Sequence, residues 1–418
     1  MSKKGGIVPE LRFPEFKNNW EIKPLYKVYE FKITNSLSRD KLNYDDGKVK
    51  NIHYGDIHTK FSTLFDITKE DVPFINCNVS IERIDEDNYC QEGDIVIADA
   101  SEDMDDIGKS IELVNLNREK LLAGLHTFLA RRKMSNPVLG FGGYLFKSNG
   151  IRNQIQREAQ GAKVLGISKG RISSINIFYP NSPKEQQKIT KCLSSLDEVI
   201  TAETEKLELL KEHKKGLLQQ LFPQEGETQP KYRFPEFKDD GDWEETILEE
   251  CLDYLQPTPY LVCNTNYDDK YAIPVLTAGK TFILGYTNEK EGIYKDNLPV
   301  IIFDDFTTAS KFVDFEFKVK SSAMKILLAK GGNNIKFMFE AIQNLKFEVS
   351  THKRHWISVY SKLDILKPSG PKEQQKIANC LTSVDGLIVG QAQKLEVLQN
   401  HKKGLLQQLF PNVNDVVV

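Results

Sequence analysis

The sequence predicts a mixed α/β protein in which two α/β globular domains are separated by two long helices that form an intramolecular coiled coil. The first observation is a repeat. The 41 residues from Pro183 return at Pro371 without a gap, and 27 of them are identical. A repeat of this length sets the architecture before any local assignment is made.

The second observation is a shorter repeated segment that precedes each variable part of the chain. The hexapeptide RFPEFK occurs at residues 12–17 and again at 233–238, and Trp20 and Trp243 follow closely. Between this segment and the long repeat lie two blocks of sequence, at about 24–180 and 247–368, with no obvious similarity to each other. A repeated frame therefore carries two different inserts, which predicts a pseudo-twofold arrangement.

Each copy of the long repeat reads as one helix. Proline suits the first helical position and cannot continue a helix, so Pro183 and Pro371 mark starts and Pro223 and Pro411 mark ends. Apolar residues recur at alternating spacings of four and three, which is the heptad seam of a coiled coil. The seam residues are Leu193, Leu196, Leu207, Leu210 and Leu217 in the first copy, and Leu381, Val384, Leu395, Leu398 and Leu405 in the second.

Polar residues interrupt the seam at the same two places in each copy. These are Glu203 and Lys214 in the first helix and Gln391 and Lys402 in the second. Buried polar residues can fix the register of paired helices, and this is our hypothesis for the four positions. Each helix would be about 55 Å long. The alternative is two unrelated surface helices, but the seam runs the full length of both, which favours pairing.

Length and composition limit the possible classes. A chain of 418 residues should hold two or more domains, and its net charge of −3 argues against a protein that coats DNA non-specifically. The start of the chain lacks the apolar segment of a signal peptide, and no apolar run is long enough to span a membrane. The six cysteines are scattered without a CxxC pair, so we expect a cytoplasmic protein without disulfides or a zinc site.

The two blocks mix strand-like and helix-like segments. The first predicts strands at residues 93–98, 109–114 and 123–130, and helices at 137–147 and 150–159. The second predicts strands at residues 271–276, 299–303 and 315–319, and a helix at 336–343. The predicted domains are an N-terminal globule (residues 1–182), the first repeated helix (183–223), a second globule (224–370), and the second repeated helix with its tail (371–418).

Charge is segregated in the same way in both blocks. Residues 66–106 hold 14 acidic and 2 basic side chains, and residues 107–180 hold 3 acidic and 12 basic ones. Residues 239–305 hold 15 acidic and 4 basic side chains, and residues 306–370 hold 5 and 11. A basic second half suits a surface that faces phosphates, although such runs are also common on ordinary solvated faces.

Polar loops flank the predicted strands in both blocks. Small, hydroxyl-bearing and basic residues can reach phosphates and base edges, and ordinary hydrophilic turns are the alternative. The candidate DNA-binding residues are Ser101, Lys109, Lys163, Lys169 and Arg171 in the first block, and Lys280, Tyr286, Thr307, Thr308 and Lys311 in the second.

The sequence contains few patterns of an enzyme. It has no phosphate-binding glycine motif and no adenine-methyltransferase tetrapeptide, and neither His53/His58 nor His352/His355 has a metal-ligand spacing. One trace resembles the D…ExK pattern of metal-dependent nucleases: Asp304 and Asp305, followed by Glu316 and Lys318. Alternation with Phe315, Phe317 and Val319 explains Glu316 and Lys318 as the solvent face of a strand. We therefore predict no catalytic residue and no metal in this chain.

PKEQQKI and HKKGLLQQLFP, each present in both halves of the chain, together with RFPEF and its following Trp, resemble the specificity subunit of type I restriction-modification enzymes. The resemblance covers nearly the whole chain. It implies that each block is a target-recognition domain that reads one half of a split double-stranded DNA site. It implies that the two long helices pack antiparallel as a spacer. It also implies that the helices and the domains bind two copies of a methyltransferase subunit and, in the full enzyme, restriction subunits. S-adenosylmethionine, ATP and Mg²⁺ would then bind those partners.

Two alternatives to a sequence-specific DNA-binding subunit remain at this stage. One is a stand-alone metal-dependent nuclease that uses Asp304, Asp305, Glu316 and Lys318. The other is a coiled-coil scaffold that binds proteins only.

Overall fold

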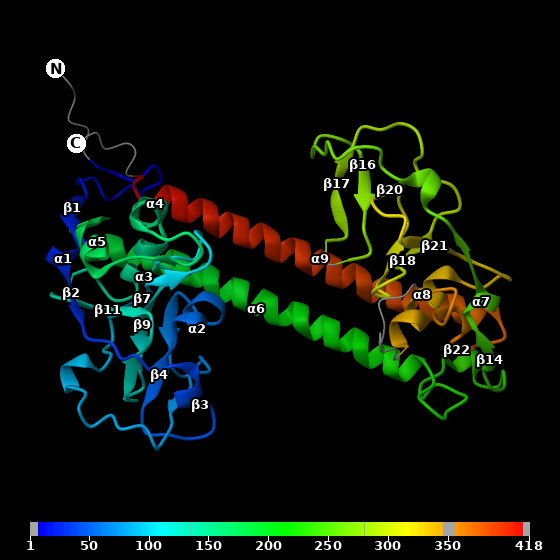
Figure 1. Cartoon of the computed structure of the whole chain (residues 1–418), viewed down its shortest axis with the longest axis horizontal. Coiled ribbons are helices and arrows are strands. Elements are labelled where there is room, and N and C mark those ends of the chain that lie inside the picture. Colours follow the sequence, from blue (N-terminus) through cyan, green and yellow to red (C-terminus); the bar gives the residue numbers. More distant parts are fainter. Residues whose placement is uncertain (1–6, 135, 280, 346–355, 413–418) are drawn as a thin grey trace. The chain divides into compact units, whose positions relative to one another are not determined.

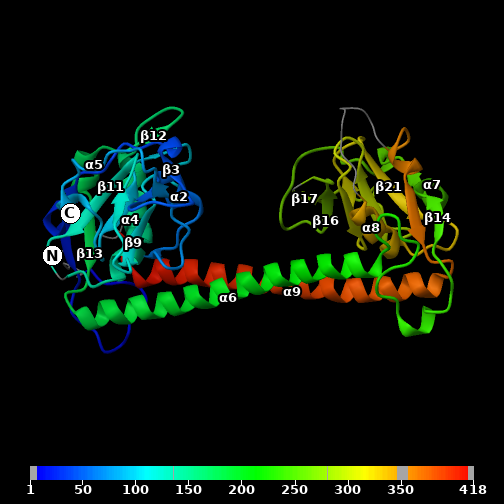
Figure 2. The ribbon, with the colours of Figure 1, turned by 90° about the horizontal axis from the view of Figure 1, so that it is seen from below.

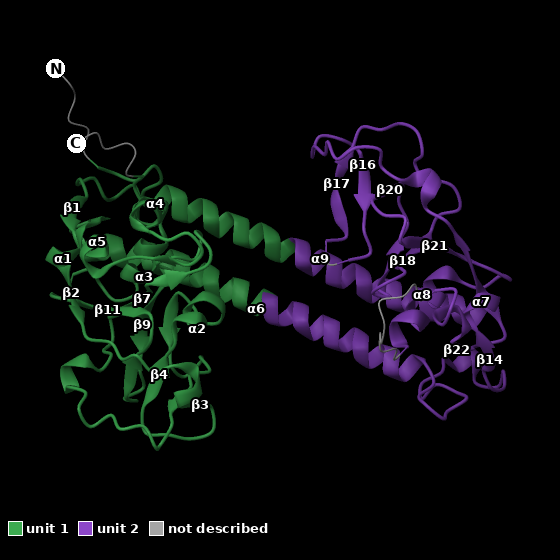
Figure 3. Cartoon of the chain, viewed as in Figure 1, with its two compact units in different colours: residues 1–203, 394–418 green, residues 204–393 purple. Residues whose placement is uncertain are grey.

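The computed structural model describes residues 7–134, 136–279, 281–345 and 356–412, and the chain falls into two compact units. Unit 1 consists of residues 1–203 and 394–418, and unit 2 consists of residues 204–393 (Figure 3). The two longest helices, α6 (Pro183–Leu221) and α9 (Pro371–Leu409), each contribute one half to each unit. Every unit is therefore built from its own variable block and from both copies of the long repeat.

Unit 1 is organised around a five-stranded sheet. Its order is β2 (Tyr29–Lys32), β11 (Thr127–Arg132), β7 (Ile95–Ala98), β9 (Ser110–Asn115) and β5 (Leu64–Asp66). Only the β5–β9 pair is parallel. All four residues of β7 are buried, as expected for a central strand covered on both faces.

The rest of unit 1 covers this sheet and extends it (Figure 1). A second sheet has the order β10 (Leu121–Ala123), β4 (Lys50–Ile52), β6 (Phe74–Ile75) and β3 (Leu42–Asn43). Two small sheets pair β1 (Glu21–Pro24) with β13 (Asn176–Tyr179), and β8 (Ala100–Ser101) with β12 (Leu165–Gly166). The shorter helices are α1 (Leu25–Val28), α2 (Tyr54–Thr59), α3 (Phe141–Lys147), α4 (Asn149–Glu158) and α5 (Lys169–Ser174).

Unit 2 has a smaller set of sheets. The largest is antiparallel, with the order β15 (Leu252–Leu255), β21 (Met324–Ala329), β18 (Val300–Asp304) and β19 (Ser310–Val313). A three-stranded sheet has the order β17 (Ile283–Thr287), β16 (Ile273–Leu276) and β20 (Lys318–Val319), and β14 (Glu244–Ile247) pairs with β22 (Asp364–Lys367). Helices α7 (Leu248–Cys251) and α8 (Ile335–Asn344) complete the unit.

Within each unit, the half of α6 and the half of α9 lie side by side and run in opposite directions (Figures 1 and 2). In unit 1, Leu193 near the start of α6 shares a core with Leu409 at the end of α9. In unit 2, Leu221 at the end of α6 shares a core with Ile377 and Leu381 near the start of α9. All ten predicted seam residues are buried or half-buried.

Ion pairs join the two helices in both units. In unit 1, Lys402 pairs with Asp197, and Glu203 pairs with Lys394. In unit 2, Lys214 Nζ lies 2.8 Å from Asp385 Oδ1 and 3.0 Å from Glu340 Oε1. Burial opposes the charge of Lys214, but the hydrogen bonds to Asp385 and Glu340 outweigh it and raise the Lys214 pKa. The polar seam residues Lys214 and Lys402 thus pair with Asp385 and Asp197, which occupy equivalent positions in the two repeats.

The first turn of each long helix binds the RFPEF segment that precedes that helix in the chain. In unit 1, Arg12 Nε and Nη2 donate to Glu185 at 2.8 and 2.9 Å, and Trp20 Nε1 donates to the same carboxylate at 3.1 Å. In unit 2, Arg233 Nε and Nη2 donate to Glu373, both at 2.8 Å. This two-pronged geometry is specific for a guanidinium and a carboxylate.

The end of each helix packs against the tryptophan of the other repeat. The rings of Trp20 and Phe410 are 6.0 Å apart in unit 1, and those of Trp243 and Phe222 are 5.9 Å apart in unit 2. The repeated LFP ending therefore supplies a core aromatic to the unit that begins with the other repeat. This arrangement accounts physically for why RFPEF, Trp, PKEQQ and LFP all recur.

Several predicted segments differ from the structure at their boundaries. The strand predicted at 123–130 is two strands, β10 and β11, because His126 adopts a positive φ of 55° and turns the chain between them. The helix predicted at 137–147 begins only at Phe141, after Gly140 with φ 86°. Of residues 315–319, only Lys318 and Val319 form a strand. All six cysteines are free.

Glu112, in the centre of β9, docks helix α3 onto the sheet. Its two carboxylate oxygens accept hydrogen bonds from the backbone N–H groups of Gly140 (2.8 Å) and Gly143 (2.7 Å). Burial raises the pKa of Glu112 to about 7, although these hydrogen bonds favour the ionised form.

Glu112 should make the stability of unit 1 depend on pH. Its pKa is higher in the folded than in the unfolded state, so between about pH 4.5 and 7 the folded state binds more protons and loses stability as the pH rises. The loss is at most about 3 kcal/mol. Chemical unfolding at several pH values should show this slope in the wild type, and Glu112→Gln should flatten it. An equal slope in both proteins would contradict the assignment.

The Arg233–Glu373 pair should be a strong determinant of unit 2 stability. Both side chains are almost fully buried, with relative exposures of 6% and 3%. Arg233→Ala leaves a buried carboxylate without its partner, and we expect a loss of about 3–5 kcal/mol in denaturant unfolding. The control is Lys376→Ala, which removes an ion pair to Glu236 that is about half exposed and should leave the unfolding stability almost unchanged. Equal effects of the two variants would contradict this prediction.

Candidate nucleic-acid interface

Three loops of unit 1 meet at the end of strand β7. Asp99 follows this strand, and its backbone N–H donates to the carbonyl of His126 at 3.0 Å. The carbonyl of Asp99 accepts from the backbone N–H of Ile167 at 3.0 Å, beside the β8–β12 pairing. Residues 99–101, 124–127 and 160–167 are thus held together by backbone hydrogen bonds.

The side chain of His126 lies at this meeting point. Its Nδ1 lies 3.1 Å from Asp99 Oδ1, and 51% of the side chain is exposed. The ring of Tyr54 on α2 packs edge-on against the imidazole, with 5.3 Å between the two ring centroids. Asp99 and Tyr54 therefore restrict the orientation of an exposed imidazole.

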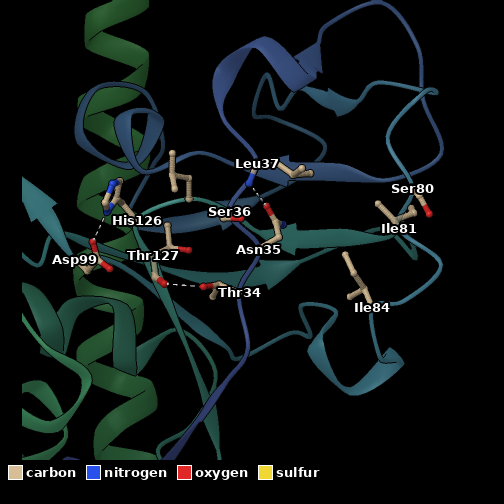
Figure 4. A pocket seen from close by; sticks show the side chains of 11 residues that line it. Thr34, Asn35, Ser36, Leu37, Ser80, Ile81, Ile84, Asp99, His126 and Thr127 are labelled. Carbon is tan, nitrogen blue, oxygen red and sulfur yellow. Dashed lines mark hydrogen bonds and ion pairs between the residues drawn. The ribbon is translucent and has the colours of Figure 1, made fainter.

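A cleft of about 430 Å³ opens beside His126 (Figure 4). It is lined by Thr34, Asn35, Ser36, Leu37, Ser80, Ile81, Ile84, Asp99, Leu125, His126 and Thr127. Its polar wall is tied to the sheets. Thr34 Oγ1 donates to the carbonyl of Thr127 at 3.1 Å, and Asn35 Nδ2 donates to Asn51 Oδ1 at 2.7 Å. The hydroxyls of Ser36 and Ser80 lie on exposed residues of the rim.

Helix α2 contacts His126 through Tyr54, and the first histidine pair noted in the sequence lies at its N-cap and near its end. His53 caps the helix by accepting from the Gly55 N–H at 3.1 Å, and His58 Nε2 lies 3.1 Å from the Ala100 carbonyl. Burial, together with the charge of Arg39, lowers the pKa of His53. Both residues are half-buried, His53 at the N-cap of α2 and His58 within the helix. His352 and His355 lie outside the described residues.

The structure brings together some of the predicted DNA-binding residues of unit 1. Ser101 is buried in β8 and accepts a hydrogen bond from Asp103 N at 3.0 Å. Lys109 Nζ donates to the carbonyl of His58 at 2.6 Å, next to Ala100. Lys163 is exposed in the loop that leads to β12. These three residues surround the Asp99–His126 end of the sheet.

The other two candidates of unit 1 make different contacts. Lys169, the first residue of α5, places Nζ 5.8 Å from the ring of Phe31 on β2. Arg171 lies on the same helix, with Nη1 3.3 Å from the Glu158 carboxylate. Arg171 therefore fastens α5 to the end of α4.

In unit 2, the predicted residues Thr307 and Thr308 lie at the tip of the β18–β19 hairpin. Asp304 Oδ1 accepts from Phe306 N (3.0 Å), Thr307 N (2.8 Å) and Thr307 Oγ1 (3.0 Å), which fixes the turn. Thr308 has a positive φ of 59°. The hairpin presents the Phe306 side chain to solvent with 42% exposure, which the sequence did not predict.

The remaining candidates of unit 2 are more dispersed. Lys311 is half-buried on β19, and Tyr286 is half-buried on β17. Lys280 lies outside the described residues.

The residues of the nuclease-like trace have separate structural partners. Asp305 is buried, accepts from Trp356 N at 2.8 Å, and faces Lys325 Nζ at 3.4 Å. Lys318 is also buried, with Nζ 2.8 Å from the Glu289 carboxylate, so the expectation that it lies on a solvent face is wrong. Glu316 is exposed. Within the described ranges, no group of three or more His, Cys, Asp or Glu residues is arranged to hold a metal ion.

Four of the large apolar residues that the long helices expose occupy equivalent positions in the two repeats. Val199 and Val397 are 44% and 67% exposed in unit 1, and Leu387 and Leu209 are 60% and 64% exposed in unit 2. Each unit therefore presents one such residue from each helix. Among the described residues, no helix is both long and apolar enough to cross a membrane.

Sequence signals could have located only part of this surface. The segments that contain Ser101 and Lys163 could be selected from their small and basic residues. His126 was missed because it lies in an apolar stretch, LLAGLHTFLA, that reads as one strand. The Gly-Leu-His sequence in the middle was the only sign of a turn.

Residues 17–212 match the family model described as "Type I restriction modification DNA specificity domain". The specificity subunit of the type I restriction enzyme EcoR124I/EcoR124II from Escherichia coli is 53% identical over 137 residues. That match spans 31% of this chain and 34% of the relative. The putative specificity subunit of the MjaX enzyme from Methanocaldococcus jannaschii is 24% identical over 95% of this chain and 94% of its own length.

Solved structures agree with these matches at the level of the fold. The S subunit of a type I restriction-modification system from M. genitalium has a TM-score of 0.63 at 13% identity, covering 97% of this chain and 100% of that one. A chain from a study of the assembly and conformational transition of a type I system has a TM-score of 0.51, also at 13% identity, covering 93% and 96%.

Proposed function

Because the chain belongs to the family of type I restriction-modification specificity subunits, we propose that it selects the DNA sequence on which such a complex acts and is not itself a catalyst. Unit 1 reads one half of an interrupted, asymmetric site and unit 2 reads the other. The observation that carries this proposal is the repeated frame that holds two dissimilar α/β blocks. Two different readers on equivalent supports suit a site with two different halves.

The surfaces of the two units support reading by loops. Unit 1 offers the cleft beside His126 with its hydroxyl-bearing rim, and unit 2 offers the fixed hairpin tip at Thr307 and Thr308. Hydroxyl, imidazole and basic side chains bond base edges in the major groove, and lysines bond phosphates. We propose these same roles, contacts to base edges and to phosphates, for the candidate residues named from the sequence.

The proposed partners are double-stranded DNA, two copies of a methyltransferase subunit and, in a full enzyme, restriction subunits. Two copies are supported by the exposed apolar residues of the helices, which recur at equivalent positions in each unit. S-adenosylmethionine, ATP and Mg²⁺ bind these partners in our proposal. Since duplex DNA is the substrate, the site of action is the cytoplasm.

The proposal is tested by mapping methylated bases in the host genome with and without this gene. We expect one interrupted, asymmetric motif to lose its methylation when the chain is absent. The purified complex should also protect that motif from nuclease digestion, with an affinity that falls steeply as salt increases. A methylome that does not change, together with no protected sequence, would favour a scaffold that binds only proteins.

The apolar helix positions predict the stoichiometry of the methyltransferase partner. Val397→Asp in unit 1 or Leu209→Asp in unit 2 should each remove one of two copies, because a charge is costly in an apolar contact. Native mass spectrometry should then show a one-to-one complex, and the double variant should bind no partner.

The control for this experiment is Gln399→Asp. Residue 399 is also exposed and lies two positions further along α9, roughly on the opposite side of the helix. It should leave two copies bound. If both single variants also retain two copies, the partner docks elsewhere.

A further inference from the structure

We propose that His126 is a residue of unit 1 that determines sequence specificity, and that it accepts a hydrogen bond from the exocyclic amino group of an adenine or cytosine. Asp99 is a positioning residue for this contact. The inference rests on the proposed function and deepens it, because it assigns base reading in one half of the site to one side chain.

The first argument is rigidity. A side chain that reads a base must keep its orientation before it binds, or part of the binding free energy is lost in ordering it. His126 is held by three contacts: its backbone carbonyl accepts from Asp99 N at 3.0 Å, its Nδ1 lies 3.1 Å from Asp99 Oδ1, and Tyr54 packs against its ring. Asp99 is itself fixed, since its carbonyl accepts from Ile167 N.

The second argument is the backbone conformation. His126 has a φ of 55°, an uncommon value for a residue with a side chain. Glycine would fit this turn without cost, so the turn itself does not require an imidazole. The side chain is nevertheless 51% exposed beside a cleft of about 430 Å³ (Figure 4). The backbone turn therefore does not by itself account for an exposed, fixed imidazole in this position.

The third argument concerns hydrogen-bond chemistry. The Asp99 carboxylate only accepts, so Nδ1 carries the ring proton and Nε2 of the neutral imidazole is an acceptor. Within the described part of the chain, Nε2 has no protein partner. In the major groove, the groups that donate are the adenine N6 and cytosine N4 amino groups. The free nitrogen therefore matches these two bases and not guanine or thymine.

The surroundings of the cleft fit a base edge with its flanking backbone. Ser36 and Ser80 place hydroxyl groups on the exposed rim, and Lys163 is exposed on the neighbouring loop. These groups can bond phosphates or adjacent bases around a central contact made by His126. Asn35 is not available for reading, because its amide already bonds Asn51, Ala123 and Leu37.

The experiment compares variants of the full chain in complex with the cognate methyltransferase subunit, with methylation mapped on a library of DNA sites. His126→Asn tolerates the positive φ, and His126→Gly removes any strain, so both should keep the wild-type melting temperature. We expect both to relax the requirement at one base pair in one half-site by about tenfold. The other half-site serves as an internal control and should not change.

Asp99 is tested by its own pair of variants. Asp99→Ala frees the imidazole and should relax the same base pair, whereas Asp99→Asn keeps an acceptor for Nδ1 and should restore most of the discrimination. The matched control is His401→Ala, which removes an exposed histidine of unit 1 from helix α9 and should leave the motif intact.

The possible outcomes separate the inference from the proposed function. An unchanged motif in both His126 variants would overturn the inference and leave the function standing. A uniform loss of affinity for all sequences, with a weaker salt dependence, would show that His126 contacts a phosphate and would also overturn it. A wild-type complex that methylates no specific motif would overturn the proposed function itself.

Discussion

The structure depends on the pairing of two copies of one helix in opposite directions. In both units, the half-helices are joined by an apolar seam and by a lysine–aspartate pair at equivalent repeat positions, Lys402–Asp197 and Lys214–Asp385. Apolar seams tolerate several registers, whereas a partly buried charge left without its partner is costly. These pairs support the hypothesis that polar residues specify the register of the seam, a role that needs no large contribution to net stability.

The same repeat fixes how each variable block is attached. An arginine near the start of each half, Arg12 or Arg233, forms a bidentate ion pair with a glutamate in the first turn of the long helix that follows its block. The nearby tryptophan, Trp20 or Trp243, packs on the phenylalanine at the end of the other long helix. The attachment uses residues of the frame, so the loops at the far ends of the sheets are free to differ. This explains how two blocks without similarity occupy equivalent places in one chain.

Much of this architecture could be predicted because its signals are periodic or repeated. The heptad pattern and the prolines that bound it predicted the positions of α6 and α9. Alternating or continuous apolar runs predicted β7, β9 and β18. The partners of single polar residues could not be predicted in this way. Glu112 is one acid in a strand, and nothing local shows that it will lie under the N–H groups of Gly140 and Gly143. Lys318 seemed exposed by alternation, but Glu289, 29 residues earlier in the chain, pairs with it in the interior.

The candidate site was harder to predict for the same reason. The small and basic residues Ser101, Lys109 and Lys163 could be selected from the sequence. The turn that exposes His126 could not, because it interrupts a stretch whose sequence is typical of one strand. Loops that bind different DNA sequences carry no fixed pattern, so the geometry of the fold is needed to show which side chains converge.

The central claim is that two independent DNA-recognition units are attached to one repeated frame. Exchange of one variable block tests this claim most directly. Residues 247–368 would be replaced by the corresponding block of another family member, and the methylated motif of the resulting complex would be determined. The account predicts that one half-site changes to that of the donor and that the half-site read by unit 1 stays the same. A change in both half-sites, in a chimera that folds and still binds its methyltransferase partner, would contradict it.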